Sequence, residues 1–334
     1  MRADCTPAGR LLATSCAVLA LAGCITTAPP PATTETAAGP QGGEQVYAVG
    51  DIAQCGSGPP AAAPAARTAA LVPAGATVLA AGDLAYWHAD AAALQGCFDA
   101  TWGRHRERML VAVGNHDYVN GTTAAVRDYF PQAARAISED FFAYAAQPAA
   151  GWWLVVLDSN VAGEPMRRQQ EWLEQTLAGM RGDPDSSTAC LAVMWHAPVY
   201  SSGLHRGSGE HMRPLWAIID RYQADLVLSG HEHFYERFGP LDADARAQPE
   251  GQAPRQFVVG TGGAHLYGFW KPPYRSESRV LRHGVLQLSL ESGRYGWRFI
   301  DVDGRARDAG AARCRAPVNS GNVPATAARP TADQ

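Results

Sequence analysis

Lysine is almost missing from this 334-residue sequence, in which Lys271 is the one lysine among 28 lysine and arginine residues. We interpret this bias as an effect of genome composition and not as a functional signal. Charged residues make up only 18% of the chain, and the formal net charge is -4. The sequence therefore lacks the basic stripe by which nucleic-acid-binding proteins hold phosphates, and we expect no nucleic-acid partner.

A long hydrophobic run is missing as well. The apolar stretch at residues 11–20 follows Arg2 and Arg10, and it is shorter than the roughly 20 residues that span a bilayer. It fits an export signal that ends in Leu21-Ala22-Gly23-Cys24. That end resembles the bacterial lipobox, whose cysteine is lipidated and becomes the new N-terminus. An ordinary cleaved signal is the alternative. We expect Cys24 to be lipidated and to anchor an exported protein to the cell envelope, on its periplasmic or extracellular face.

The composition predicts four segments. Residues 1–23 are the signal peptide, and residues 24–43, rich in Thr, Pro, Ala and Gly, form a flexible tether that carries no core. Residues 311–334 have the same composition and predict a disordered tail. The segment 44–310 is long enough for one large domain, and it contains no internal repeat or linker.

Buried strands alternate with helices along this domain. Near-continuous apolar runs, typical of strands covered on both faces, lie at 46–49, 77–81, 109–113, 152–157, 190–195 and 225–229. Helices are expected at about 165–180 and 212–222. Partial alternation at 256–260, 284–290 and 296–301 indicates antiparallel strands of a second sheet. The fold class is therefore α/β, a four-layer α/β/β/α sandwich with two mixed sheets.

Five polar motifs each follow one of these apolar runs. They are Gly50-Asp51-Ile52-Ala53, Gly82-Asp83-Leu84-Ala85-Tyr86, Gly114-Asn115-His116-Asp117, Trp195-His196-Ala197-Pro198 and Gly230-His231-Glu232-His233. Ligands of α/β sheets bind at the carboxyl ends of the strands, where these motifs would converge. Their oxygen and imidazole groups suit two neighbouring metal ions. The set predicts a hydrolase with a two-metal site.

One glycine-rich segment needs a separate interpretation. Gly260-Thr261-Gly262-Gly263 suggests a phosphate-binding loop, but no Gly-Lys-Ser/Thr sequence follows it. It is therefore not a P-loop, and we expect a tight turn near the site.

The ordered series of motifs resembles the calcineurin-like metallophosphoesterase superfamily, and within it the purple acid phosphatases most closely. The resemblance covers residues 46–301. Most of the superfamily carries Asp-x-His in the first motif, but this chain has Ala53. Purple phosphatases also lack that histidine and have a tyrosine three residues after the second aspartate, here Tyr86. The sequence leaves no room for the N-terminal β-sandwich of the large plant-type enzymes, so we expect the single-domain form.

The resemblance implies two metal ions as cofactors, Fe(III) at the Tyr86 position and Fe(II), Zn or Mn beside it. Asp83 would bridge the ions, and the iron-phenolate bond would colour the protein. His231 and His233 reach one site only if Glu232 points away or the backbone turns sharply. The implied ligands are Asp51, Asp83, Tyr86, Asn115, His196, His231 and His233.

Three further residues would face the substrate. His116 resembles the family's substrate-facing histidine, and Asp117 would orient it. His205 matches a histidine that contacts phosphate and protonates the leaving group, and the identity of the general acid stays open between these two histidines. Many relatives carry a second histidine where this chain has Arg206, which either clamps a phosphate oxygen or lies in solvent.

The expected activity is hydrolysis of small-molecule phosphomonoesters by in-line attack of a metal-bound hydroxide. Phosphodiesterases and nucleotidases of the superfamily use the same site, so these activities are the alternative. A non-catalytic lipoprotein that binds metal or phosphate is a less favoured third interpretation.

The cysteines predict structural disulfides. Cys5 and Cys16 lie in the signal and Cys24 would carry lipid, which leaves Cys55, Cys97, Cys190 and Cys314. An even number in an oxidising compartment predicts two bonds. The preferred pair is Cys55 with Cys97, because both should lie in loops near the first two metal motifs.

Overall fold

The computed structural model describes residues 42–54, 56, 63–186, 188–205, 209–272 and 275–315. The expected signal peptide, Cys24 and most of the tether lie outside these ranges. No helix among the described residues is both long and apolar enough to cross a bilayer.

Two mixed sheets form the centre of the fold. The six-stranded sheet has the order β15-β14-β13-β1-β3-β5. Strands β1, β3 and β5 are parallel to one another, whereas the pairs β1–β13, β13–β14 and β14–β15 are antiparallel. Its strands are β1 (Glu44–Val49), β3 (Thr77–Ala81), β5 (Met109–Ala112), β13 (Gly284–Glu291), β14 (Arg294–Asp301) and β15 (Ala306–Arg313).

The second sheet has seven strands in the order β12-β10-β11-β9-β8-β7-β6. They are β6 (Tyr144–Ala149), β7 (Trp152–Val156), β8 (Cys190–Met194), β9 (Leu226–Ser229), β10 (Tyr235–Pro240), β11 (Arg255–Val259) and β12 (Ser276–Val280). A short parallel pair, β2 (Ala53–Gln54) and β4 (Ala85–Tyr86), lies beside the large sheets.

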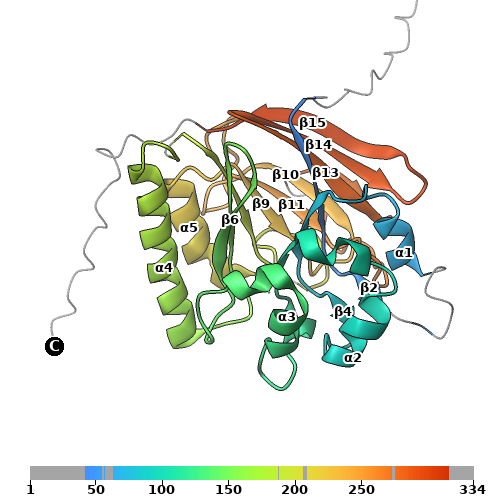
Figure 1. The fold of residues 1–334 in the computed structure, drawn as a ribbon. Helices are drawn as coiled ribbons and strands as arrows, with labels where there is room; N and C mark the ends of the chain where they lie inside the picture. Colours follow the sequence, from blue (N-terminus) through green and yellow to red (C-terminus); the bar gives the residue numbers. More distant parts are fainter. Residues whose placement is uncertain are drawn as a thin grey trace, which may run out of the picture. The chain divides into compact units, whose positions relative to one another are not determined.

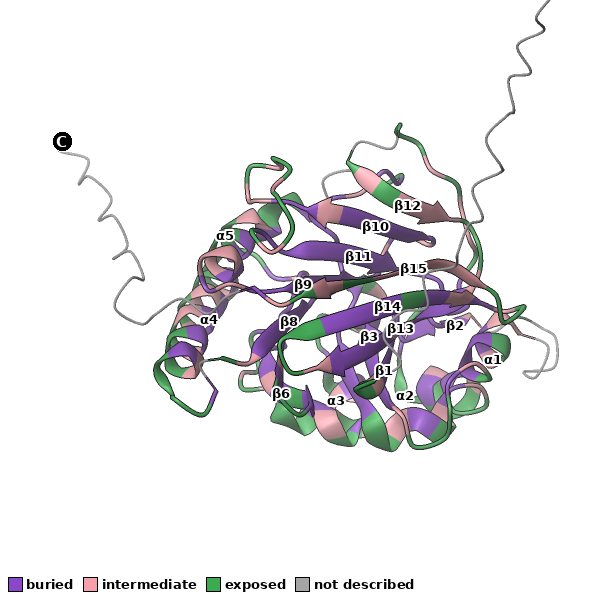
Figure 2. Ribbon diagram, turned by 90° about the horizontal axis from the view of Figure 1, so that it is seen from above, coloured by how far each residue is buried: buried purple, intermediate pink, exposed green. Residues whose placement is uncertain are grey.

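Helices cover the outer faces of both sheets. On one side are α4 (Gly163–Gly182) and α5 (Arg213–Arg221), and on the other are α1 (Pro64–Ala69), α2 (Ala91–Ala93) and α3 (Ala124–Tyr129), as Figures 1 and 2 show. Short helical turns accompany them, namely η2 (Leu94–Phe98), η3 (Gly103–Arg108), η4 (Asn115–Asp117), η5 (Pro131–Arg135) and η6 (Glu210–Met212). The four-layer α/β/β/α arrangement expected from the sequence is confirmed.

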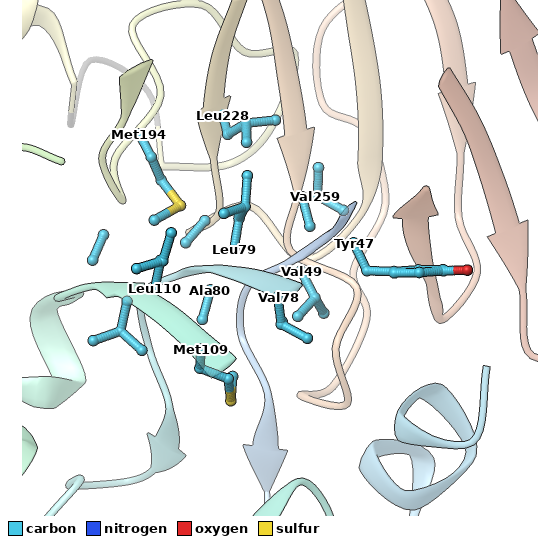
Figure 3. Packing of buried hydrophobic residues seen from close by; sticks show 14 of the residues in the cluster. Tyr47, Val49, Val78, Leu79, Ala80, Met109, Leu110, Met194, Leu228 and Val259 are labelled. Carbon is cyan, nitrogen blue, oxygen red and sulfur yellow. The ribbon is translucent and has the colours of Figure 1, made fainter. Parts of the chain in front are cut away.

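Alternate side chains of the central strands of the seven-stranded sheet enter two separate cores, which explains the unbroken apolar runs of those strands. Ala192 and Met194 pack in the core that contains the six-stranded sheet, and Leu191 and Val193 pack in the core that contains α4 and α5. Figure 3 shows the first core, where Met194 and Leu228 lie beside Leu79. Both faces of each central strand are therefore shielded from water.

The sheet membership of the late strands differs from the expectation. β11 pairs in parallel with β9 and belongs to the seven-stranded sheet, whereas β13 and β14 extend the sheet of β1. Apolar periodicity identifies a strand but does not encode its neighbour. Four strands of the two large sheets, β6, β10, β12 and β15, were not predicted, and neither were the short β2 and β4. β12 has a largely polar sequence, and β15 consists of alanine, glycine and charged residues without a large apolar side chain.

The C-terminal boundary also moves. The expected limit at residue 310 is wrong, because β15 continues to Arg313 and Cys314 forms a disulfide with Cys190 at the start of β8. A backbone ladder and a covalent bond hold this segment, and neither leaves an apolar pattern in the sequence. Cys97 is also disulfide-bonded. Cys55 lies outside the described residues, so its pairing with Cys97 stays a prediction.

Candidate metal centre

The predicted site residues lie where the carboxyl ends of both sheets meet. Asp51 follows β1 and Asp83 follows β3 in one sheet, while His196 follows β8 and His231 follows β9 in the other. The Gly50 amide donates to the Val259 carbonyl across the boundary, with an N···O distance of 2.8 Å. Parallel strands from two sheets thus deliver four polar side chains to one place.

Three of these residues have left-handed backbones. The φ angles of Asp51, Asp83 and His231 are 57°, 53° and 69°. Such angles are uncommon for residues other than glycine and concentrate at functional sites. The positive angles turn each chain sharply at the strand end, so that the side chains face the centre of the site.

A buried carboxylate fixes the second and third motifs. Asp117 accepts hydrogen bonds from the amides of Gly114, Asp83 and Leu84 at 2.7, 2.8 and 2.9 Å. The expectation that Asp117 orients the His116 ring is therefore wrong, because its carboxylate is occupied by the main chain. Gly114 is required here, since a Cβ on it would lie 2.1 Å from Asp83 Oδ1.

The first group of donors surrounds the Tyr86 hydroxyl. Tyr86 Oη lies 2.9 Å from Asp51 Oδ1, 2.9 Å from Asp83 Oδ2 and 3.0 Å from His233 Nε2. His233 Nε2 is also 3.2 Å from Asp51 Oδ1. One hydroxyl hydrogen cannot serve three acceptors, so these atoms form a cluster of lone pairs suited to a cation.

The second group lies on the other side of Asp83. His196 Nε2 is 3.3 Å from Asp83 Oδ2, and His231 Nδ1 is 3.2 Å from His196 Nε2 and 3.0 Å from Asn115 Oδ1. The potential ligand atoms of Asp83, His196 and His231 lie within 4.8 Å of one another. Asp83 is common to both groups, as expected for a bridging carboxylate.

Hydrogen bonds to the main chain orient two of the histidines. His196 Nδ1 donates to the Ala81 carbonyl at 2.8 Å, and His233 Nδ1 donates to the His265 carbonyl at 2.7 Å. These bonds leave Nε2 of each ring as a lone-pair donor that faces the cluster. Metal-ligating histidines in proteins are held in this way, so the residues present fit a pair of metal ions.

The electrostatics of the site favour positive charge. Burial alone would raise the pKa of Asp83, but His196 and His116 beside it lower the pKa below its usual range. Burial lowers the pKa of His196, yet Asp83 outweighs this effect and raises it to about 10. Burial, reinforced by Asp51 and Asp83, raises the pKa of the Tyr86 phenol far above its usual range. A phenolate at this place therefore needs a cation beside it.

Glu232 points away from the site, which meets the condition for His231 and His233 to share it. The Glu232 carboxylate is buried and accepts the amides of Leu204 and His205 at 3.2 and 3.1 Å. A few residues further, Glu236 accepts the Ser202 amide at 2.9 Å. Two buried glutamates thus hold the loop at residues 201–205 against the strands that carry the histidines.

The two histidines expected to face the substrate are held by different contacts. His116 Nδ1 donates to the Trp87 carbonyl at 2.7 Å, and its Nε2 lies 3.9 Å from Asp83 Oδ2. His205 Nδ1 lies 2.8 Å from the Tyr267 hydroxyl, which itself donates to the His231 carbonyl. The hydroxyl therefore accepts the Nδ1 hydrogen of His205, which leaves Nε2 as the free nitrogen of that ring.

A cavity of about 210 Å³ opens over these residues. Both histidines line it, together with four residues that the sequence did not single out as functional: Gln54, Trp87, His265 and Tyr267. Gln54 ends β2, Trp87 follows β4, and His265 and Tyr267 share the segment after β11. These segments have no shared local pattern, and only proximity to the motifs could have suggested Gln54 and Trp87. Arg206, the predicted substrate contact, lies outside the described residues.

The family follows from this arrangement together with the sequence. Residues 45–235 match the family model of the calcineurin-like phosphoesterases, and the chain belongs to that family. Membership implies a dinuclear metal centre, in agreement with two donor groups that share Asp83.

Several relatives are purple acid phosphatases. The chain is 32% identical to purple acid phosphatase 21 of Arabidopsis thaliana over 164 residues, which cover 46% of this chain and 36% of the relative. It is 31% identical to the phosphoenolpyruvate phosphatase of Allium cepa over 270 residues, 69% of this chain and 53% of the relative. The chain thus spans about half or less of the length of these relatives.

A solved structure supports the fold. Purple acid phosphatase PPD1 from yellow lupin (Lupinus luteus) seeds superimposes with a TM-score of 0.62 at 17% sequence identity, covering 81% of this chain and 54% of that one. At this identity the likeness concerns the fold alone, and it agrees with the four layers described above.

Proposed function

We propose that the protein is an exported, metal-dependent phosphatase that hydrolyses phosphomonoesters. The observation that carries this proposal is the convergence of two donor groups on Asp83, beneath a cavity lined by His116 and His205. A protein that only stores metal has no need of two oriented histidines above its ligands. Phosphoester hydrolysis requires both features.

The donor chemistry distinguishes two positions. Asp51, Tyr86 and His233 would hold Fe(III) with Asp83, because a phenolate and carboxylates suit a hard trivalent ion. Asn115, His196 and His231 would hold Fe(II), Zn or Mn on the other side of Asp83. When bound, the two ions would neutralise phosphate charge and supply the nucleophile at the pH of the cell envelope.

The histidines supply the remaining chemistry. His116, held by the Trp87 carbonyl, is placed to hydrogen-bond a phosphate oxygen as charge develops on it. His205 is held at Nδ1, so its Nε2 can carry a proton to the leaving oxygen of the alcohol. We assign leaving-group protonation to His205, because His116 Nε2 lies 3.9 Å from Asp83 Oδ2 and is therefore placed for the phosphate above the ligands.

The cellular location rests on the sequence. The lipobox-like segment that ends at Cys24 would place a lipid at the new N-terminus, and residues 24–43 would hold the domain away from the membrane. Loss of membrane association in Cys24→Ser would support this location. A membrane-bound Cys24→Ser protein would exclude the lipid anchor.

The proposed function is tested by metal analysis, a visible spectrum and a p-nitrophenyl phosphate assay on the same sample. We expect about two metal ions per chain, a charge-transfer band that disappears in Tyr86→Phe, and turnover. Turnover without colour would keep the hydrolase and exclude the iron-tyrosinate centre. Absence of both metal and turnover in folded protein supplied with iron, zinc and manganese would overturn the proposal.

A further inference from the structure

A second cavity adjoins the metal centre, and its role depends on the proposed function. It has a volume of about 300 Å³ and is lined by the loop after β8, the start of α5, β10 and the segment at Lys271. His205 lines both this cavity and the one over the metal-centre residues. The two cavities are therefore neighbours that meet at a single histidine.

Part of the wall of the second cavity is apolar and aromatic. Tyr200, Phe238 and Leu241 contribute to it, and all three are largely buried. The exposed parts of these side chains offer a surface for the carbon skeleton of a ligand, beside Ser201 and Ser202 of the same lining. An aromatic or aliphatic body of a few carbon atoms fits such a volume and such walls.

Two cations stand at the same cavity. Arg213 and Lys271 line it, and Glu210 is the one carboxylate among its lining residues. Within the described residues neither cation forms an ion pair, although Arg213 Nη1 donates to the Ala243 carbonyl at 2.9 Å. The Lys271 amide donates to the Ser202 carbonyl at 3.0 Å, which fixes this residue against the loop that carries His205. The lining therefore carries more positive than negative charge.

We propose that this cavity binds the alcohol portion of the phosphoester and selects alcohols with an apolar or aromatic body and an anionic substituent. The phosphate would lie over the metal centre, the ester oxygen beside His205, and the carbon skeleton against Tyr200 and Phe238. Lys271 and Arg213 would pair with the anionic substituent. The same placement puts the leaving oxygen at the histidine that borders both cavities.

The test compares two esters that differ by one carboxylate, phenyl phosphate and 4-carboxyphenyl phosphate, on the full chain supplied with metal. The wild type should have the lower KM for the carboxylated ester. Lys271→Gln should raise the KM for that ester about threefold to fivefold more than the KM for phenyl phosphate, as one partly exposed ion pair predicts. Glu210→Gln should change the same ratio in the opposite direction, because it removes the negative charge of the cavity.

A matched control removes a positive charge elsewhere. Arg305, exposed in the β14–β15 turn of the six-stranded sheet, is changed to Gln and should leave the KM ratio at its wild-type value. If Lys271→Gln and Glu210→Gln behave like Arg305→Gln, the cavity does not bind the alcohol and the proposal is overturned.

The remaining outcomes separate this proposal from the proposed function. Turnover of both esters with equal KM overturns the selectivity and leaves the phosphatase intact. Preferential cleavage of the diester methyl phenyl phosphate reassigns the cavity to a second ester arm and overturns the monoester proposal. If none of the three esters is turned over, both the cavity proposal and the proposed phosphatase function are overturned.

Discussion

Two clusters of charged side chains in this protein are built in opposite ways. At the metal centre Asp51 and Asp83 face the Tyr86 phenol and imidazole nitrogens of His196 and His233. A second cluster joins β10, β11, β12 and β15, where Arg237 and Arg255 pair with Glu277 and Asp308. In the second cluster each carboxylate meets a permanent cation.

The backbones differ in the same sense. Asp51 and Asp83 have positive φ angles, whereas Arg237 and Asp308 lie within strands and do not. Both nitrogens of the Arg237 fork bind Asp308, with N···O distances of 2.7 and 3.0 Å. The paired charges of the Arg237–Asp308 cluster indicate that it stabilises the fold. The unpaired carboxylates on strained backbone at the metal centre indicate a site that binds a cation. Variants can test that distinction.

The largest effect is expected for Asp83→Asn. The amide keeps the shape of the side chain and can donate to the lone pairs of Tyr86 and His196, but it cannot bridge two cations. Metal content and turnover should fall together, with kcat/KM lower by more than about a thousandfold. Thermal unfolding of the metal-free protein should be unchanged or occur at higher temperature. Full metal content with wild-type turnover would remove Asp83 from the ligand set.

His116→Ala should separate chemistry from metal binding. The ring contacts Trp87 O and lies 3.9 Å from Asp83 Oδ2, so its loss leaves the ligand cluster in place. We expect both ions to remain and kcat to fall about 100-fold to 1,000-fold. Metal analysis and steady-state kinetics on one sample would check this, and loss of metal would instead make His116 a ligand.

Asp308→Asn should affect stability and not turnover. Burial raises the pKa of Asp308, but hydrogen bonds from Arg237 and Tyr235 outweigh it and lower the pKa. Breaking this buried pair should reduce the free energy of unfolding by about 3 kcal/mol at neutral pH.

The pH dependence of that effect follows from its sign. A carboxyl with a lowered folded-state pKa stabilises the fold above its unfolded pKa of about 4, and the contribution disappears as the pH falls through the folded-state value. The difference between wild type and Asp308→Asn should therefore be largest near pH 7 and shrink below about pH 4. A difference that stays constant across this range would show that Asp308 contributes shape and not charge.

The structure brings the ligand residues proposed from the sequence to one place, because each follows a buried strand within a few residues. The sequence predicted no role for Tyr267 or for the Arg237–Asp308 pair, because their contacts join residues 62 and 71 positions apart in the chain. Asp117 was misassigned for a related reason. Its neighbour in sequence is His116, but its side chain turns to the main chain of Gly114, Asp83 and Leu84.

The strands, like the site residues, were predicted only in part. The doubly covered strands such as β8 and β9 have apolar residues on both faces and were found from that pattern. The edge strand β15 has no large apolar side chain. It is held by its ladder with β14 and by the nearby Cys190–Cys314 disulfide. Neither of those interactions appears as hydrophobic periodicity, and therefore the domain boundary was placed too early.

The smallest effect, and the sharpest on mechanism, is expected for Tyr267→Phe. Its hydroxyl accepts the Nδ1 hydrogen of His205 and donates to the His231 carbonyl. Its loss keeps the His205 ring but leaves Nδ1 with the longer contact to Glu232 Oε2, at 3.4 Å. If His205 protonates the leaving oxygen, kcat should fall about tenfold for glycerol phosphate, whose alkoxide needs a proton, and much less for p-nitrophenyl phosphate. Glu232→Gln, which weakens the hold on the same loop, should show the same selectivity. An equal loss on both substrates would make Tyr267 a support for the metal ligands and would leave protonation of the leaving group to His116.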